Sequence, residues 1–94
     1  DLAVQVEADV RGAMLDLNAA RDQVVAVRDR LRLVEEEVSL SRERFRAGVV
    51  GNAEVITAQL NITAARSQFV DALTAFHSAR VSLARATGRV TALP

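Results

Sequence analysis

The fold is decided by the stretch Gly48-Val49-Val50-Gly51-Asn52, which separates two long segments of helix-forming composition. Residues 2–47 and 53–88 are rich in Ala, Leu, Arg and Glu and show no alternation typical of strands, so we predict that both are α-helices. A connection of this length requires the two helices to lie antiparallel. The sequence therefore predicts an all-α chain, folded over residues 1–94 as a single helical hairpin with a tip loop at 48–52 and no β-structure.

The residues at the predicted helix ends have the chemistry that caps helices. Gly48 can adopt the left-handed conformation that closes the first helix, and Asn52 can cap the second. Glu54, in the first turn of the second helix, suits the positive end of the helix dipole. Gly88 is expected to close the second helix as Gly48 closes the first, which leaves residues 89–94 as an exit strand or linker.

Both segments carry a heptad pattern of apolar residues, which we call the seam. Alternating steps of three and four residues meet an apolar side chain at every position except Ser41, which predicts a long antiparallel coiled coil. Every second seam residue of the second segment is Ala, which lets the backbones approach closely. Folding at the tip loop brings residues whose numbers sum to about 100 level with each other, for example Val38 and Ile62. The seam consists of Ala3, Val6, Val10, Ala13, Leu17, Ala20, Val24, Val27, Leu31, Val34, Val38, Ser41 and Phe45, and of Val55, Ala58, Ile62, Ala65, Phe69, Ala72, Phe76, Ala79, Leu83 and Ala86.

Each segment also carries apolar residues on a side away from the seam, which we call the second stripe. Two helices cannot bury these additional residues between themselves, so we expect further helices to flank the hairpin on both sides. From the pattern alone, a larger wall of helices and a four-helix bundle formed by dimerisation satisfy this requirement equally well. The second stripe consists of Ala19, Ala26, Leu33, Leu40 and Ala47, and of Ile56, Leu60, Val70, Leu73, Val81 and Ala84 interleaved with Thr63, Ser67 and Thr74.

The composition argues against enzymatic chemistry and against nucleic-acid binding. Twelve basic side chains balance twelve acidic ones, so no basic surface for nucleic acid is expected. With no cysteine and a single histidine, the chain offers neither a thiolate nor an imidazole cluster. That histidine, His77, lies on the second stripe and is expected to be a packing residue. We therefore predict that the chain is not an enzyme and that it binds no cofactor and no metal.

The residues around the tip loop follow a distinctive order. An arginine, an aromatic residue and a glycine are followed, after a short gap, by an acid, apolar residues and the pair Ala-Gln. This order, on two heptad helices, resembles the hallmark of the TolC-like outer membrane efflux proteins, and the resemblance covers nearly the whole chain. It is carried by Arg44-Phe45-Arg46-Ala47-Gly48-Val49-Val50-Gly51-Asn52-Ala53-Glu54-Val55-Ile56-Thr57-Ala58-Gln59, with Val10-Arg11-Gly12-Ala13-Met14-Leu15-Asp16-Leu17-Asn18-Ala19-Ala20-Arg21 upstream and Leu83-Ala84-Arg85-Ala86-Thr87-Gly88 downstream.

The resemblance implies a trimeric outer-membrane channel that works in tripartite efflux or type I secretion. Each protomer of such a channel contributes two helical hairpins to a periplasmic tube, so this chain would be one hairpin, or stave, of a trimeric α-barrel. The β-barrel strands that hold the protein in the outer membrane, the signal sequence and the second hairpin would lie outside these residues. The implied partners are a periplasmic adaptor, an inner-membrane transporter and, in the full-length homotrimer, further copies of the same protein.

The resemblance also implies roles for residues at the tip. Glu54 would lie near the constriction of the channel, just inside the loop. Some members carry a loop arginine where Val50 stands and a second acid where Thr57 stands, so an apolar tip contact is favoured over an ionic gate. The residues that would contact the adaptor are Phe45, Gly48, Val49, Val50 and Gly51.

Two other interpretations fit the heptads. A periplasmic adaptor contains a helical hairpin of its own, but that hairpin should lack the aromatic residue and glycine at the tip followed by Ala-Gln. A cytoplasmic coiled-coil scaffold would form a stable dimeric four-helix bundle instead. Flanking sequence distinguishes the first alternative, and the oligomeric state of the chain distinguishes the second.

Overall fold

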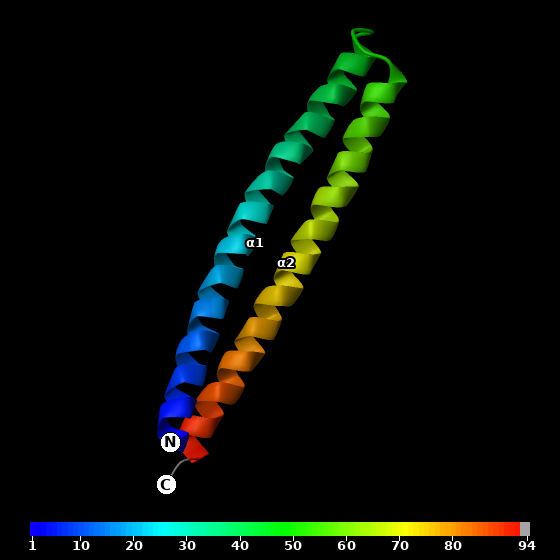
Figure 1. The fold of residues 1–94 in the computed structure, drawn as a ribbon. Coiled ribbons are helices and arrows are strands. Elements are labelled where there is room, and N and C mark those ends of the chain that lie inside the picture. Colours follow the sequence, from blue (N-terminus) through cyan, green and yellow to red (C-terminus); the bar gives the residue numbers. More distant parts are fainter. Residues whose placement is uncertain (93–94) are drawn as a thin grey trace. The chain divides into compact units, whose positions relative to one another are not determined.

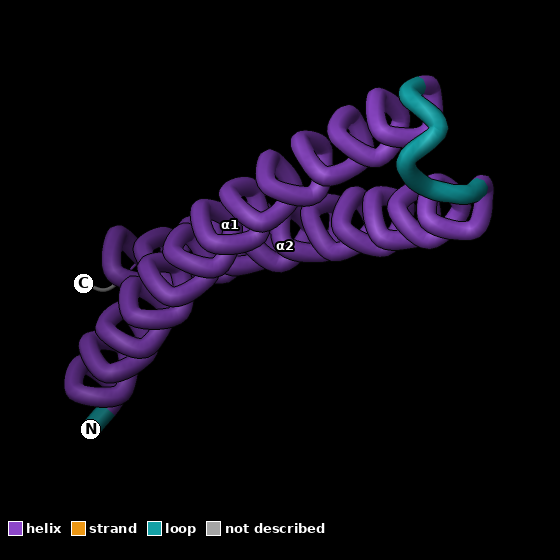
Figure 2. The backbone as a smooth tube through the Cα atoms, turned by 90° about the horizontal axis from the view of Figure 1, so that it is seen from above, coloured by secondary structure: helices purple, strands orange, loops and turns teal. Residues whose placement is uncertain are grey.

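A computed structural model describes the backbone of residues 1–92 and the side chains of residues 1–89. The described chain forms two helices, α1 (Leu2–Arg46) and α2 (Asn52–Ala92), which residues 47–51 connect (Figure 1). Figure 2 shows helix and loop over residues 1–92 and no strand. The prediction of an all-helical chain with two long helices and a short loop is confirmed.

The chain divides into two compact units. The loop unit, Val25–Asp71, contains the second half of α1, the loop and the first half of α2. The terminal unit contains Asp1–Val24 and the part of α2 that begins at Ala72. In each unit α1 and α2 lie side by side and run in opposite directions, as predicted (Figure 1).

Burial follows the predicted seam in both units. In the loop unit Leu31 packs against a buried cluster made of Val34, Val38, Ala58, Ile62 and Ala65. In the terminal unit Val6, Ala13, Ala72 and Ala86 are buried. The exceptions are Ala3 and Phe45, which lie near the ends of α1 and are exposed because fewer neighbours surround a helix end.

Two ion pairs agree with the predicted register. In the loop unit a nitrogen of Arg44 lies 3.0 Å from Glu54 Oε1, and in the terminal unit a nitrogen of Arg89 lies 3.0 Å from Asp9 Oδ2. The residue numbers of each pair sum to 98. In both units α1 and α2 are therefore aligned as the sequence predicts.

The end of α1 is a Schellman motif centred on Gly48. The backbone N–H of Val49 donates to the Arg44 carbonyl over 2.9 Å, and that of Gly48 donates to the Phe45 carbonyl over 3.0 Å. These two bonds satisfy carbonyls that the last helical turn leaves without a partner. The motif requires a left-handed residue, and Gly48 has a φ of 76°. The predicted role of Gly48 is confirmed.

Both predicted ends of α2 need correction. The helix begins at Asn52, so the capping position falls on Gly51 and the predicted cap at Asn52 is wrong by one residue. Gly88 has no left-handed φ, and α2 continues through it to Ala92. A single helical Gly costs only about 1 kcal/mol, and the next residue, Arg89, forms an ion pair with Asp9 of α1. The predicted strand or linker is therefore wrong for residues 89–92, and residues 93–94 lie outside the described part.

Replacement of Ile62 by Ala tests the seam. Ile62 is 5% exposed within the buried cluster, so Ile62→Ala should lower the free energy of unfolding by about 2–4 kcal/mol. Leu60, two residues away, is 66% exposed, and Leu60→Ala should change the stability of the 94-residue chain by less than about 0.5 kcal/mol. Urea unfolding followed by circular dichroism measures both changes. Equal losses in the two variants would contradict the assignment of the seam.

Two glycine substitutions should have opposite effects on stability. Gly48→Ala forces a Cβ into the left-handed region and should destabilise the chain by about 1–2 kcal/mol. Gly88→Ala replaces a helical glycine that has open space around it, so it should stabilise the chain by up to about 1 kcal/mol. Thermal unfolding of both variants distinguishes them. A loss of stability in Gly88→Ala would mean that α2 ends there, as first predicted.

Candidate functional site

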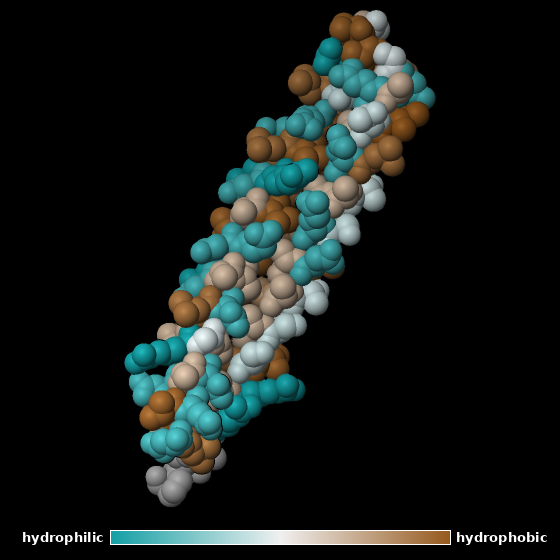
Figure 3. Space-filling model, in the orientation of Figure 1, coloured by the Kyte–Doolittle hydropathy of each residue, from teal (hydrophilic) through white to brown (hydrophobic). Residues whose placement is uncertain are grey.

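The loop carries an exposed apolar surface, which we call the tip and define as Phe45, Gly48, Val49, Val50 and Gly51. Phe45 is 46% exposed and Val49 is 68% exposed, whereas Val50 is half-buried. Figure 3 shows apolar side chains gathered on the visible surface at the loop end of the helices. The Schellman motif fixes Gly48 and Val49 directly after Phe45, so the two large exposed side chains belong to one turn of backbone. The structure thus brings the predicted tip residues together.

Glu54, the predicted constriction residue, is half-buried and paired with Arg44. The Arg44 guanidinium donates a hydrogen bond to Glu54 Oε1 over 3.0 Å, across the loop from the last turn of α1 to the first turn of α2. The sequence analysis did not predict this pair. The signal was available, because the predicted register places the two residues level. Arg44 and Glu54 line a shallow groove together with Glu37, Leu40, Ser41, Thr57, Ala58 and Asn61.

The second stripe of α2 exposes apolar side chains, and in the terminal unit its residue Val81 lines a groove together with Arg85. In the loop unit Ile56, Leu60 and Val70 are each more than half exposed. The hydroxyl of Thr63, which lies between them on the same stripe, donates to the Gln59 carbonyl over 3.0 Å. Because the hydroxyl donates to a carbonyl of its own helix, it needs no hydrogen-bond acceptor from another segment. Leu73 is the exception to the predicted exposure, because it is half-buried.

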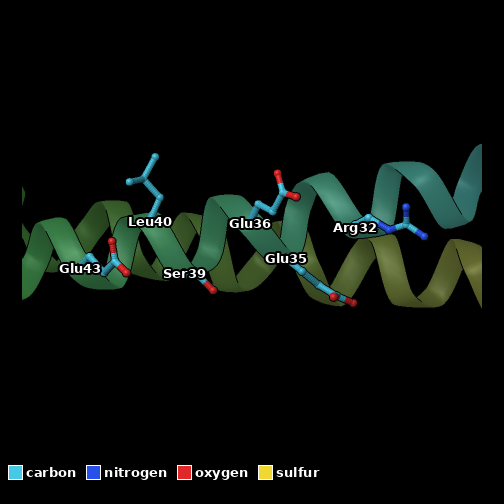
Figure 4. A pocket seen from close by; sticks show the side chains of 6 residues that line it. All are labelled: Arg32, Glu35, Glu36, Ser39, Leu40 and Glu43. Atoms are coloured by element: carbon cyan, nitrogen blue, oxygen red, sulfur yellow. The ribbon is translucent and has the colours of Figure 1, made fainter.

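The second stripe of α1 is interrupted by charge. Leu33 and Leu40 are exposed, as predicted. Leu40, however, lies in a shallow groove on α1 among charged and polar side chains (Figure 4). A face of this composition is typical of a solvated helix surface. The side chains that line the groove with Leu40 are Arg32, Glu35, Glu36, Ser39 and Glu43.

His77, which the sequence analysis expected to be a packing residue, is exposed in this chain. Its ring lies 6.0 Å from the ring of the adjacent Phe76, between centroids, and the Arg80 guanidinium lies 5.9 Å from the Phe76 centroid. Among residues 1–92 no three His, Cys, Asp or Glu side chains come together in a way that could hold a metal ion. Within the same residues neither helix has a stretch long and apolar enough to cross a membrane.

Comparison with known proteins gives a family. Searches of curated proteins and of solved structures found no match. The family model of the outer membrane efflux proteins matches residues 3–89, which include nearly all of α1, the whole loop and most of α2. A match of this extent includes the seam, the second stripe and the tip. The chain belongs to the outer membrane efflux protein family.

Proposed function

We propose that this chain forms a stave in the periplasmic α-barrel of a trimeric outer-membrane channel, and that its tip contacts a periplasmic adaptor. The channel would serve tripartite efflux or type I secretion together with an inner-membrane transporter. The observation that carries the proposal is the exposure of the apolar side chains Ile56, Leu60 and Val70 on the second stripe of α2, in a chain of the outer membrane efflux protein family. The location that follows is the periplasmic portion of an outer membrane protein.

The second stripe supports a place within a wall of helices. Ile56, Leu60 and Val70 are exposed although each is as apolar as the residues of the seam. Several large apolar side chains exposed on one face of a helix are typical of a contact with another protein segment. Since Thr63 bonds to its own helix, a neighbouring helix can cover the stripe without leaving that hydroxyl unpaired.

The tip supports an apolar end-on contact with the adaptor. Phe45 and Val49 are exposed on one turn of backbone, and the two hydrogen bonds of the Schellman motif restrain that turn. A pre-organised apolar surface costs little entropy when it binds. Glu54 follows directly inside the tip, where we place the narrow part of the channel.

A dimeric four-helix bundle also covers the second stripe, so the scaffold remains the competing function. Membership of the efflux family favours the channel wall. The two functions differ in the assembly that the second stripe stabilises. It is a trimeric channel in the first case and a dimer of this chain in the second.

A charge on the second stripe should block assembly without unfolding the hairpin. Leu60→Glu, in the channel protein that contains this segment, should reduce the fraction of trimer by about tenfold or more, because burial of an unpaired carboxylate is costly. Gln68→Glu, at an exposed position of α2 outside the stripe, is the matched control. Native mass spectrometry of the purified protein counts the subunits. Full trimer formation by Leu60→Glu would contradict the wall, and a dimer of the 94-residue chain that Leu60→Glu dissolves would favour the scaffold.

A charge at the tip should prevent adaptor binding without reducing the amount of channel. Val49→Asp adds a carboxylate to the most exposed side chain of the tip, so capture of the adaptor by cross-linking should fall by about tenfold. Ser39→Asp adds the same charge to the acidic face of α1 and serves as the control. Unchanged capture in Val49→Asp, at equal channel abundance, would refute the tip contact.

A further inference from the structure

We infer that Arg44 is the positioning residue of the tip, because its backbone and its side chain together fasten both sides of the loop. The Arg44 carbonyl accepts the N–H of Val49, at the start of the loop. The Arg44 guanidinium donates to Glu54, which lies in the first turn of α2. One residue thus connects the end of α1, the tip and the beginning of α2.

The orientation of the ion pair adds to its stability. Arg44 lies in the last turn of α1, where the helix dipole favours a positive charge, and Glu54 lies in the first turn of α2, where it favours a negative one. The side chains of Arg44 and Glu54 are 45% and 38% exposed, so water screens the attraction only in part. Glu37 lines the same groove, but the hydrogen bond of Arg44 goes to Glu54.

The pair determines what the tip presents to a partner. Because the Arg44 guanidinium compensates the negative charge of Glu54, the first turn of α2 offers a partner no uncompensated acid. The loop is also held in one conformation before a partner arrives, which lowers the entropy lost on binding. This use of the pair rests on the proposed function, whereas the fastening of the loop does not.

A double-mutant cycle on the 94-residue chain tests the inference through amide hydrogen exchange of Val49, whose N–H is bonded to the Arg44 carbonyl. Arg44→Gln and Glu54→Gln should each speed this exchange by about two- to fivefold, the range expected for a partly exposed ion pair. The double variant should be no faster than either single variant, because both remove the same interaction. High salt should speed the exchange in the wild type and have little effect in the variants.

Arg46→Gln is the matched control. Arg46 also lies in the last turn of α1, and the side chains of residues 1–89 show no ion pair for it, so it shares the dipole effect but not the pair. Its exchange rate at Val49 should match the wild type. Equal exchange rates of the Val49 amide in Arg44→Gln and Arg46→Gln would overturn the inference. So would a double variant whose rate increase is the product of the increases in Arg44→Gln and Glu54→Gln. Circular dichroism verifies that each variant keeps its helices.

Adaptor capture separates this inference from the proposed function. In the channel protein, Arg44→Gln should weaken capture by about two- to fivefold, less than Val49→Asp does. If Val49→Asp leaves capture intact while the exchange cycle behaves as expected, the tip contact fails and the positioning role of Arg44 stands. If Val49→Asp abolishes capture but Arg44→Gln changes neither exchange nor capture, the tip contact stands and the role of Arg44 fails.

Discussion

The close packing of α1 against α2 along the seam is the contact on which the other features depend. Ala58 and Ala65 alternate with Ile62 on α2, so the helices approach closely while Val34 and Val38 fill the space between the small residues. Helices are stabilised mainly by packing of an apolar face, and in α1 and α2 that face is the seam. It also sets the register in which Arg44 meets Glu54 and Asp9 meets Arg89. The tip and the exposed stripe take their positions from that alignment.

The two helices differ in what they expose. In the loop unit α1 surrounds its outward leucines with Glu and Arg side chains, whereas α2 continues Ile56 and Leu60 with Thr63 and Ser67 and no charge. The same chain therefore combines a face suited to water with a face suited to another helix. This asymmetry agrees with a family whose members build channels, because a wall needs both kinds of surface.

The sequence predicted those features that depend on periodicity and on special backbone geometry. The heptads identified the seam because burial repeats with the helical period, and Gly48 was recognisable because its role needs a left-handed residue. The prediction at Gly88 was wrong because glycine is tolerated inside a helix as well as at its end, and the residue type alone does not distinguish the two. The register places Arg44 level with Glu54, but the hydrogen bond between these long side chains also depends on their rotamers, which the sequence does not give. The exposure of Phe45 likewise depends on how the chain leaves the helix.

The spacing of the two interhelical ion pairs also has a kinetic consequence. Arg44 and Glu54 are separated by 10 residues in the sequence, and Asp9 and Arg89 by 80. The entropy lost on closing a chain segment grows with its length, so contacts beside the loop are the cheapest to make from the unfolded chain. We expect the contacts between α1 and α2 to form first beside the loop and then in order of increasing distance from it, toward the two termini. The reverse order should govern opening, so that the terminal unit frays first while the tip remains ordered.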